Sequence, residues 1–346
     1  MTQNSDWHRQ RVLITGCCGT VGSELFRQLA LQQPAELIGV DSNESALFFQ
    51  GEEYRRHNNI HLRLCDIRDR DRVTSLMRGV DTVLHAAALK HVILCEEAPT
   101  EAVQTNILGT QNIIHAAIAN QTRRVLFTSS DKAVNPTNVM GTSKLMAERL
   151  ITAANVYGDE SSVFTSTRFG NVLGSSGSVI PLFRQQIATG GPVTLTDDRM
   201  TRFIMTLEAA VSLVLESVFL ARGGEVFVTK MPIVRIADLA RVMIDELAPH
   251  YGHNAEDIAI EVIGSKPGEK LYEELLSDEE TRRTVELERY FSVLPAFQNV
   301  YSDAVYDYPG MGTVGVDGAY NSDALDAMSV SELRNFLLDN QLLSKG

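Results

Sequence analysis

Three adjacent side chains in this chain could move protons, and they stand where a buried strand is expected to end. Ser130, Asp131 and Lys132 supply a hydroxyl, a carboxylate and an amine directly after the apolar run 124–128. In an open parallel sheet, ligands bind beyond the carboxyl ends of the strands. We therefore interpret the three residues as an active site for acid–base chemistry. The alternative is a capped loop whose polar side chains satisfy backbone groups.

A helix is expected to follow this stretch and to add two side chains to it. Met140 and Lys144 are four positions apart, which places them one turn apart on one face of that helix. We expect this face to complete the candidate site.

A glycine-rich turn near the start of the chain predicts a second kind of site. Gly16, Gly19 and Gly22 stand between the apolar run 12–14 and the helical pattern 24–31. In that context they allow a tight turn, approach of the backbone to a pyrophosphate and close packing of helix on strand. The pattern indicates a dinucleotide bound at the N-terminus of the helix. The alternative is an ordinary glycine-rich turn.

Asp41 ends the second predicted strand, 36–40, and lies 19 positions after Gly22. A carboxylate roughly 20 residues beyond the glycines bonds the adenosine ribose in dinucleotide-binding folds. We expect Asp41 to take this role and to favour NAD over NADP, because it would repel a 2′-phosphate. The alternative is a helix N-cap.

Further apolar runs alternate with helical patterns and predict a parallel, doubly wound α/β sheet of the Rossmann type. These runs are 60–64, 82–85, 124–128 and 162–167. Small residues at 86–88 would let a cofactor lie against the backbone. Lys90 and His91 either reach a diphosphate or sugar or belong to a solvated loop. Asn106 falls in a predicted helix over 100–119, with an exposed helix face as its alternative.

The composition changes after residue 172, where a smaller, interleaved substrate-binding domain is expected to begin. We predict a dinucleotide-binding domain over 1–172 that also receives about 204–240, and a nucleotide-sugar domain over 173–203 and 241–346. Arg168, Asn171 and Arg202 could bind phosphate; a surface ion pair is the alternative for either arginine. Glu269 opens a predicted helix over 266–276, where it either stabilises the helix dipole or binds sugar hydroxyls. The capping box 329–332 predicts a last helix.

Bulk properties indicate a cytoplasmic protein that does not bind nucleic acid. Its 346 residues are 44% hydrophobic and 22% charged, and the net charge of −13 disfavours nucleic acid and anionic membranes as partners. The four cysteines have no spacing typical of zinc sites, so no metal is expected. No apolar run is long enough to span a membrane, and we expect no signal peptide.

Several runs resemble the extended short-chain dehydrogenase/reductase superfamily. The resemblance is closest to its polysaccharide-biosynthesis branch, the UDP-N-acetylglucosamine 4,6-dehydratases. The glycines, Asp41 and a YxxxK-like helix carry the wider resemblance. The runs 88–92, 130–144, 168–183, 200–203 and 266–272 carry the closer one.

The resemblance implies roles for named residues. The nicotinamide cofactor would be held by Gly16, Gly19, Thr20, Val21, Gly22, Asp41, Asp66, Ile67, Ala86, Ala87 and Lys144. The UDP part would contact Asn171, Arg202 and Glu269, with Lys90 assisting. Chemistry would fall to Ser130, Asp131 and Lys132. The sequence does not fix the oligomeric state, and we expect a homo-oligomer only because closed symmetric assemblies are common among soluble proteins.

The implied reaction makes UDP-4-keto-6-deoxy-N-acetylhexosamine for bacterial surface polysaccharide or glycan. Lys132 would act as the base at C5 and Asp131 as the acid at C6. Met140 occupies the position of the superfamily's catalytic tyrosine, and a thioether cannot transfer a proton. Either Asp131 or a water held by Lys144 would then accept the O4 proton.

Three alternatives stay open for the function. They are a dehydratase that also inverts C5, a nucleotide-sugar C4 epimerase and a non-catalytic cofactor-binding sensor. The run 172–178 favours retention at C5. The Asp131–Lys132 pair counts against the epimerase and the sensor, because neither needs it.

Overall fold

A computed structural model describes residues 7–157, 162–173, 179–264, 268–297, 304–323 and 325–343. The described residues pack as two units. The first falls within 1–168, 211–230 and 276–319, and the second within 169–210, 231–275 and 320–346. The segment 276–319, which we grouped with the sugar domain, packs in the first unit. The domain division derived from the sequence stays a prediction.

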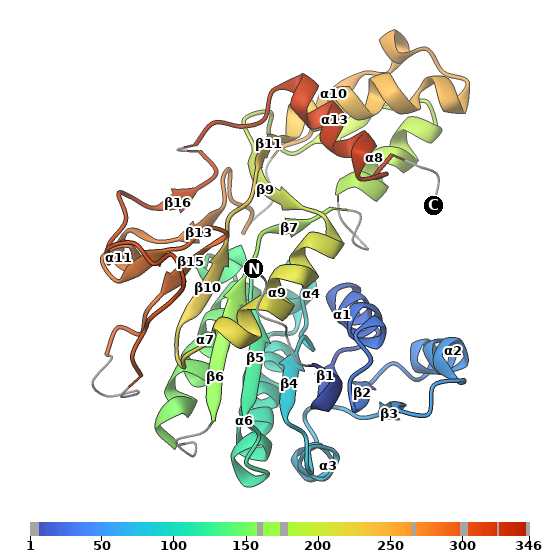
Figure 1. Ribbon diagram of the computed structural model, residues 1–346. Coiled ribbons are helices and arrows are strands. Elements are labelled where there is room, and N and C mark those ends of the chain that lie inside the picture. Colours follow the sequence, from blue (N-terminus) through green and yellow to red (C-terminus); the bar gives the residue numbers. More distant parts are fainter. Residues whose placement is uncertain are drawn as a thin grey trace. The chain divides into compact units, whose positions relative to one another are not determined.

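The first unit is built on a nine-stranded sheet with the order β14-β15-β10-β6-β5-β4-β1-β2-β3 (Figure 1). The strands from β10 to β3 pair in parallel, whereas β15 and β14 form an antiparallel edge. The order reverses between β1 and β4, which is the doubly wound pattern, so the predicted fold class is confirmed. The strand bounds are β1 Arg11–Thr15, β2 Glu36–Asp41, β3 Ile60–Leu64, β4 Thr82–His85, β5 Arg124–Thr128, β6 Val163–Arg168, β10 Val226–Thr229, β14 Thr284–Glu286 and β15 Tyr290–Val293.

Helices cover both faces of this sheet. On one face, side chains of α3 (Arg70–Leu76), α6 (Gly109–Ala119) and α7 (Val139–Tyr157) share a core with Leu13 and Phe127 of the strands. On the other face, α1 (Thr20–Leu31) lies so close that a Cβ on Gly39 of β2 would stand 2.7 Å from the ring of Phe26. Successive strand residues therefore face different helical layers.

The predicted helix 100–119 is wrong as a single element. It divides into α5 (Pro99–Ala102), a π-helical turn η2 (Val103–Leu108) and α6. A π turn holds one extra residue, which rotates the following side chains relative to an α-helix. Asn106 in this turn is only 1% exposed, so its interpretation as part of an exposed helix face is also wrong.

In its described residues, the second unit combines short sheets with helices around its own core. β7 (Asn171–Val172), β9 (Thr201–Met205) and β11 (Ile233–Arg235) form one sheet; β8 (Val193–Leu195) pairs with β12 (Ile260–Val262), and β13 (Glu274–Leu276) with β16 (Tyr320–Asn321). The helices are α8 (Val179–Ala188), α10 (Ile236–Leu247) and α13 (Val330–Asp339), and their buried side chains form one cluster.

Two predictions at the carboxyl end had different outcomes. The capping box of Ser329 and Glu332 begins α13, as predicted. The helix predicted over 266–276 is wrong, because residues 268–273 form turns and bends and β13 begins at Glu274. Among the described residues, no helix has the length and apolar character needed to cross a membrane.

Candidate active site

Two positions of the turn between β1 and α1 require glycine. Gly16 has a φ of +68°, and a Cβ there would lie 2.7 Å from the Cα of Ala87. A Cβ on Gly22 would lie 1.9 Å from the carbonyl oxygen of Gly16. Gly19 is the N-cap of α1 and provides no capping side chain, and Thr20 and Val21 form the first turn. The helix N-terminus therefore keeps amide donors for an anion.

Asp41 lies beside this turn at the end of β2. Its Oδ2 accepts from the Cys18 amide at 3.0 Å, and its Oδ1 accepts from the Asn43 amide at 2.9 Å. Asn43, rather than Asp41, caps the following helix α2 (Glu44–Tyr54), so the helix N-cap alternative for Asp41 is wrong. Carboxylate oxygens keep further lone pairs, so Asp41 can still accept from ribose hydroxyls.

A cleft of about 380 Å³ opens between these strand ends. Its lining includes seven of the predicted cofactor residues, namely Gly16, Gly19, Asp41, Asp66, Ile67, Ala86 and Ala87. Arg68, which we did not predict, also lines it and donates two hydrogen bonds to Oδ2 of Asp66. The hydrogen bonds from Arg68 hold the pKa of Asp66 below its usual range. The tight glycine turn, open helix terminus and strand-end carboxylate fit a dinucleotide.

The acid–base residues follow β5 and contact one another. The Ser130 hydroxyl donates to Oδ1 of Asp131 at 2.6 Å, and Nζ of Lys132 lies 2.8 Å from Oδ2. Ser130 also caps the short helix η3 (Asp131–Ala133), accepting from the Lys132 amide. The side chain of Asp131 is 3% exposed and that of Lys132 is 33% exposed. The Ser130 hydroxyl therefore both caps the backbone, as the capped-loop alternative expects, and contacts the carboxylate of the candidate acid–base pair.

Lys144 reaches the same strand end from α7. Its Nζ donates to the Thr128 carbonyl at 2.9 Å and lies 4.4 Å from the centre of the Phe127 ring. Burial lowers the pKa of Lys144 to about 8, although Glu148 acts in the opposite direction.

Met140, one turn earlier on α7, is in apolar surroundings. It is 3% exposed and packs with Cys95 and Ala102. The position of the missing tyrosine is therefore filled by a hydrophobic contact rather than by another proton donor.

Sequence reasoning missed the part that Asn106 plays near the cleft. Its Oδ1 accepts from the Leu89 amide at 2.7 Å, and its Nδ2 donates to the Leu89 carbonyl at 3.0 Å and to the Ser143 hydroxyl at 2.8 Å. The one available signal was an amide within an apolar helical pattern. Lys90 and His91, by contrast, are exposed and lie outside the lining of the cleft.

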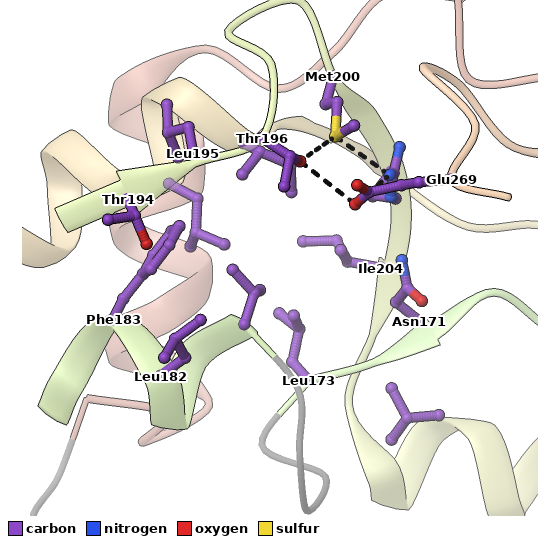
Figure 2. A pocket seen from close by; sticks show the side chains of 15 residues that line it. Asn171, Leu173, Leu182, Phe183, Thr194, Leu195, Thr196, Met200, Ile204 and Glu269 are labelled. Atoms are coloured by element: carbon purple, nitrogen blue, oxygen red, sulfur yellow. Dashed lines mark hydrogen bonds and ion pairs between the residues drawn. The ribbon is translucent and has the colours of Figure 1, made fainter. Parts of the chain in front are cut away.

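Three of the four predicted UDP residues lie together in the second unit, around a pocket of about 340 Å³ (Figure 2). The fourth, Lys90, belongs to the first unit. Asn171 comes from β7, Arg202 from β9 and Glu269 from the loop before β13. Nη2 of Arg202 lies 3.8 Å from Oε1 of Glu269, which also accepts from Thr196 at 3.2 Å. The side chains of Leu173, Leu182, Phe183, Leu195 and Ile204 form an apolar wall.

Glu273 organises this pocket and was not predicted. It is 6% exposed, accepts from Asn171 at 3.0 Å and lies 3.3 Å from Nε of Arg202. The surface ion pair considered for Arg202 is wrong, since its side chain is only 12% exposed. Glu269 does not stand at a helix N-terminus, because no helix begins there.

Arg168 does not bind phosphate as proposed from the sequence. Its side chain is 1% exposed and contacts Glu148 and Glu280 at 2.7 Å and 2.8 Å. The alternative of a surface ion pair is also wrong, because all three side chains are buried. The arginine and two glutamates instead join β6, α7 and α11 (Asp278–Thr281) within the first unit.

The doubly wound parallel sheet, with a cleft at its strand ends, is that of the extended short-chain dehydrogenase/reductase class. A sequence profile described as polysaccharide biosynthesis protein matches residues 12–295. The chain belongs to this family, and the resemblance found in the sequence is confirmed.

Relatives within the family have different names. An uncharacterized membrane protein of Methanocaldococcus jannaschii is 51% identical over 285 residues, which cover 82% of this chain and 85% of that protein. A UDP-N-acetylglucosamine 4,6-dehydratase (inverting) of Campylobacter jejuni is 36% identical over 91% of this chain and 92% of its own. A UDP-glucose 4-epimerase of Rickettsia canadensis is also 36% identical, over 94% and 95% of the two chains. The chain spans 45% of a 44%-identical Bacillus subtilis relative, a probable polysaccharide biosynthesis protein.

A solved structure shares the whole fold. The X-ray structure of Pen from Bacillus thuringiensis superposes with a TM-score of 0.89 at 44% identity, covering 98% of this chain and 99% of that one.

Proposed function

We propose that the chain is a nucleotide-sugar 4,6-dehydratase that acts on UDP-N-acetylglucosamine with a bound nicotinamide cofactor. The observation that carries the proposal is the 2.8 Å contact between Lys132 and Asp131 at the end of β5. A dehydratase needs both a base and an acid beyond hydride transfer, whereas an epimerase or a sensor does not. The dehydratase name of the Campylobacter relative supports the same reaction.

The cofactor would lie in the cleft of the first unit. Gly16, Gly19 and Gly22 would admit the diphosphate, Thr20 and Val21 would add amides at the helix terminus, and Asp41 would accept from the ribose. Asp66, Ile67, Ala86 and Ala87 would form the remaining walls, with Lys144 beyond them. When bound, a nicotinamide cofactor accepts a hydride from C4 of the sugar and returns it at C6. NAD rather than NADP stays a prediction, supported by the negative charge of Asp41.

Asp131 is suited to carry one proton between two sugar oxygens. Its contact with Ser130 offers a path for the O4 proton, which passes to the Ser130 oxygen as the serine hydrogen passes to Oδ1. Protonated Asp131 then donates to the departing 6-hydroxyl, which leaves as water. This route supplies the acceptor that Met140 cannot, and of our two earlier candidates it favours Asp131 over a water held by Lys144.

Lys132 would remove and return the C5 proton. The amine acts only when neutral, so the Asp131–Lys132 pair must release one proton before the C5–H bond breaks. The 4-keto group makes that hydrogen acidic. With 33% of its side chain exposed, Lys132 can exchange protons with solvent.

The pocket of the second unit suits the UDP part of the substrate. Its apolar wall matches a planar base, and Arg202 offers charged donors to phosphate oxygens. Asn171 and Glu269 would supply a donor and an acceptor for neutral polar groups of the ligand. A homo-oligomer and a cytoplasmic location stay predictions.

The test is to incubate the purified protein with UDP-N-acetylglucosamine and no added reductant, followed by mass spectrometry. The proposal expects a product lighter by one water, and it expects Lys132→Met and Asp131→Asn to lower the yield at least about 100-fold. An unchanged mass with the cofactor still bound would contradict the proposal.

A dehydratase that also inverts C5 is the second candidate, favoured by the name of the Campylobacter relative. Our prediction of retention came from the run 172–178, of which residues 174–178 lie outside the described part of the chain. Proton couplings around the product ring distinguish the two configurations.

A further inference from the structure

His85 ends β4 and is fully buried, yet the proposed mechanism gives it no part. Its Nδ1 lies 2.7 Å from the Thr15 hydroxyl, and its Nε2 lies 3.0 Å from the Thr110 hydroxyl. Both threonines are also fully buried. The imidazole therefore joins the last residue of β1 to α6.

The directions of these hydrogen bonds follow from their neighbours. The Thr110 hydroxyl donates to the Asn106 carbonyl at 2.7 Å, so its oxygen accepts from Nε2–H of His85. Nδ1 then carries a lone pair and accepts from the Thr15 hydroxyl, whose oxygen accepts from the Ala87 amide at 3.2 Å. Nε2 of His85 thus donates a hydrogen bond and Nδ1 accepts one, and only the neutral imidazole can do both. Burial lowers the pKa of His85 to about 3, in agreement with a neutral ring.

This chain of hydrogen bonds fixes the loop 86–89 at both of its ends. Thr15 holds the amide of Ala87, and the Asn106 side chain holds both backbone groups of Leu89. The loop lines the nucleotide cleft, and Ala87 is the residue that a Cβ on Gly16 would strike. A small displacement of the loop would thus change the space beside the glycine turn.

The same network reaches the helix that carries Lys144. Asn106 donates to the Ser143 hydroxyl, which in turn donates to the Met140 carbonyl at 2.7 Å. Ser143 precedes Lys144 directly, so the π turn, the cleft wall and the helix that carries Lys144 share one set of hydrogen bonds.

We infer that His85 is a positioning residue, whose neutral imidazole sets the 86–89 loop and the Lys144 helix for cofactor binding. The inference deepens the proposed function and rests on it for the identity of the cofactor. The His85 imidazole makes its hydrogen bonds to Thr15 and Thr110 and is not among the groups that line the cleft. Its effect passes through Thr15, Thr110 and Asn106.

The test compares Thr110→Val, which keeps the shape but leaves Nε2–H without an acceptor, with Thr110→Ser, which keeps the hydroxyl. His85→Phe and His85→Gln form a second pair, because glutamine can both donate and accept. Equilibrium titration with NAD measures affinity in each variant, and thermal unfolding measures folding. Thr284→Val is the control: Thr284 is buried and makes the same bond to the carbonyl four residues earlier, in the 276–319 segment.

We expect Thr110→Val and His85→Phe to weaken NAD binding at least tenfold, while Thr110→Ser and His85→Gln stay within threefold of the unmodified protein. Thr284→Val should lower the unfolding temperature without changing NAD affinity. NAD affinity within threefold in folded Thr110→Val would overturn the inference, and so would equal losses in the valine and serine variants. If His85→Phe does not fold, the Thr110 pair alone decides. Because the readout is binding, failure of the dehydratase reaction leaves this result interpretable.

Discussion

The side chains of two buried cations lie at the ends of neighbouring strands of the first unit, Lys144 reaching β5 from α7 and Arg168 ending β6, and their surroundings are opposite. Lys144 contacts the Thr128 carbonyl of β5 and the Phe127 ring, and no carboxylate among the described residues lies within ion-pair distance. Arg168, at the end of β6, contacts two glutamates through both edges of its guanidinium. Burial lowers the pKa of the unpaired cation to about 8, whereas Glu148 and Glu280 raise the pKa of the paired one well above its usual value.

The two environments are connected through Glu148. Glu148 lies four residues after Lys144 on α7, at the spacing where lysine and glutamate normally pair. Arg168 instead holds both oxygens of Glu148, at 2.8 Å and 2.7 Å. The fold thus uses one buried cation for stability and thereby keeps the other able to titrate. Buried charges with perturbed pKa values gather at functional sites, but paired structural charges do so as well, and only the contacts distinguish them.

Removing the unpaired cation should have the largest effect on activity. Lys144→Met is expected to lower conversion of the nucleotide sugar at least about 100-fold, because it removes the amine that we propose to help hold the cofactor. Stability should not fall, since a buried charge has been removed. Turnover and thermal unfolding measure the two effects. Lys230→Met is the matched control, because Lys230 also lies over a ring, 5.0 Å from the centre of Phe291, but pairs with Glu286. A similar loss of turnover in Lys230→Met would contradict the distinction between paired and unpaired cations.

Removing the paired cation should instead destabilise the fold. Arg168→Met leaves two buried glutamates without their cation, and we expect a loss of about 3–5 kcal/mol in the free energy of unfolding. Urea denaturation measures it. Arg289→Met removes an ion pair to Glu216 whose side chains are 49% and 39% exposed, and should cost less than about 1 kcal/mol. Equal losses in the two variants would show that burial of the Arg168 cluster is unimportant.

Acid should selectively weaken the paired cluster. Burial alone would raise the pKa of Glu280, but Arg168 lowers it from 4.5 to about 2. Because the folded pKa is the lower one, the stabilisation is present above pH 4.5 and is lost as the pH falls toward 2, by about 3 kcal/mol. The stability difference between the unmodified protein and Glu280→Gln should therefore shrink over this interval in denaturation curves. A constant difference would mean that Glu280 titrates normally.

High pH should change the free energy of unfolding through Lys144, by less than acid changes it through Glu280. The folded pKa of Lys144 is about 8 against a usual 10.5, so the unfolded chain binds more protons between these values. Stability contributed by Lys144 should rise with pH across that interval, by about 2 kcal/mol between pH 8 and 9.5. Subtracting the same curve for Lys144→Met isolates the contribution. A difference that is flat over this range would assign Lys144 an ordinary pKa.

The features that the sequence predicted are those fixed by local rules. Apolar runs followed by glycine or a carboxylate located the strand ends, and the structure places Gly16 and Asp41 at one cleft accordingly. The features that were missed depend on distant partners. Arg168 meets Glu280 across 112 positions, and Glu273 holds Asn171 across 102, which no local pattern signals. The π turn was missed because one inserted residue scarcely alters the apolar periodicity around Asn106.

The most direct test of the account is proton NMR of UDP-N-acetylglucosamine incubated with the protein in deuterated water. If the Asp131–Lys132 pair performs the proposed elimination, a C6 methyl signal appears and the C5 hydrogen is replaced by deuterium. Lys132→Ala should abolish both changes. A sugar that keeps its C5 hydrogen and its 6-hydroxyl while cofactor stays bound would contradict the proposed chemistry, and a C6 methyl that forms with Lys132→Ala would remove Lys132 from the role of base.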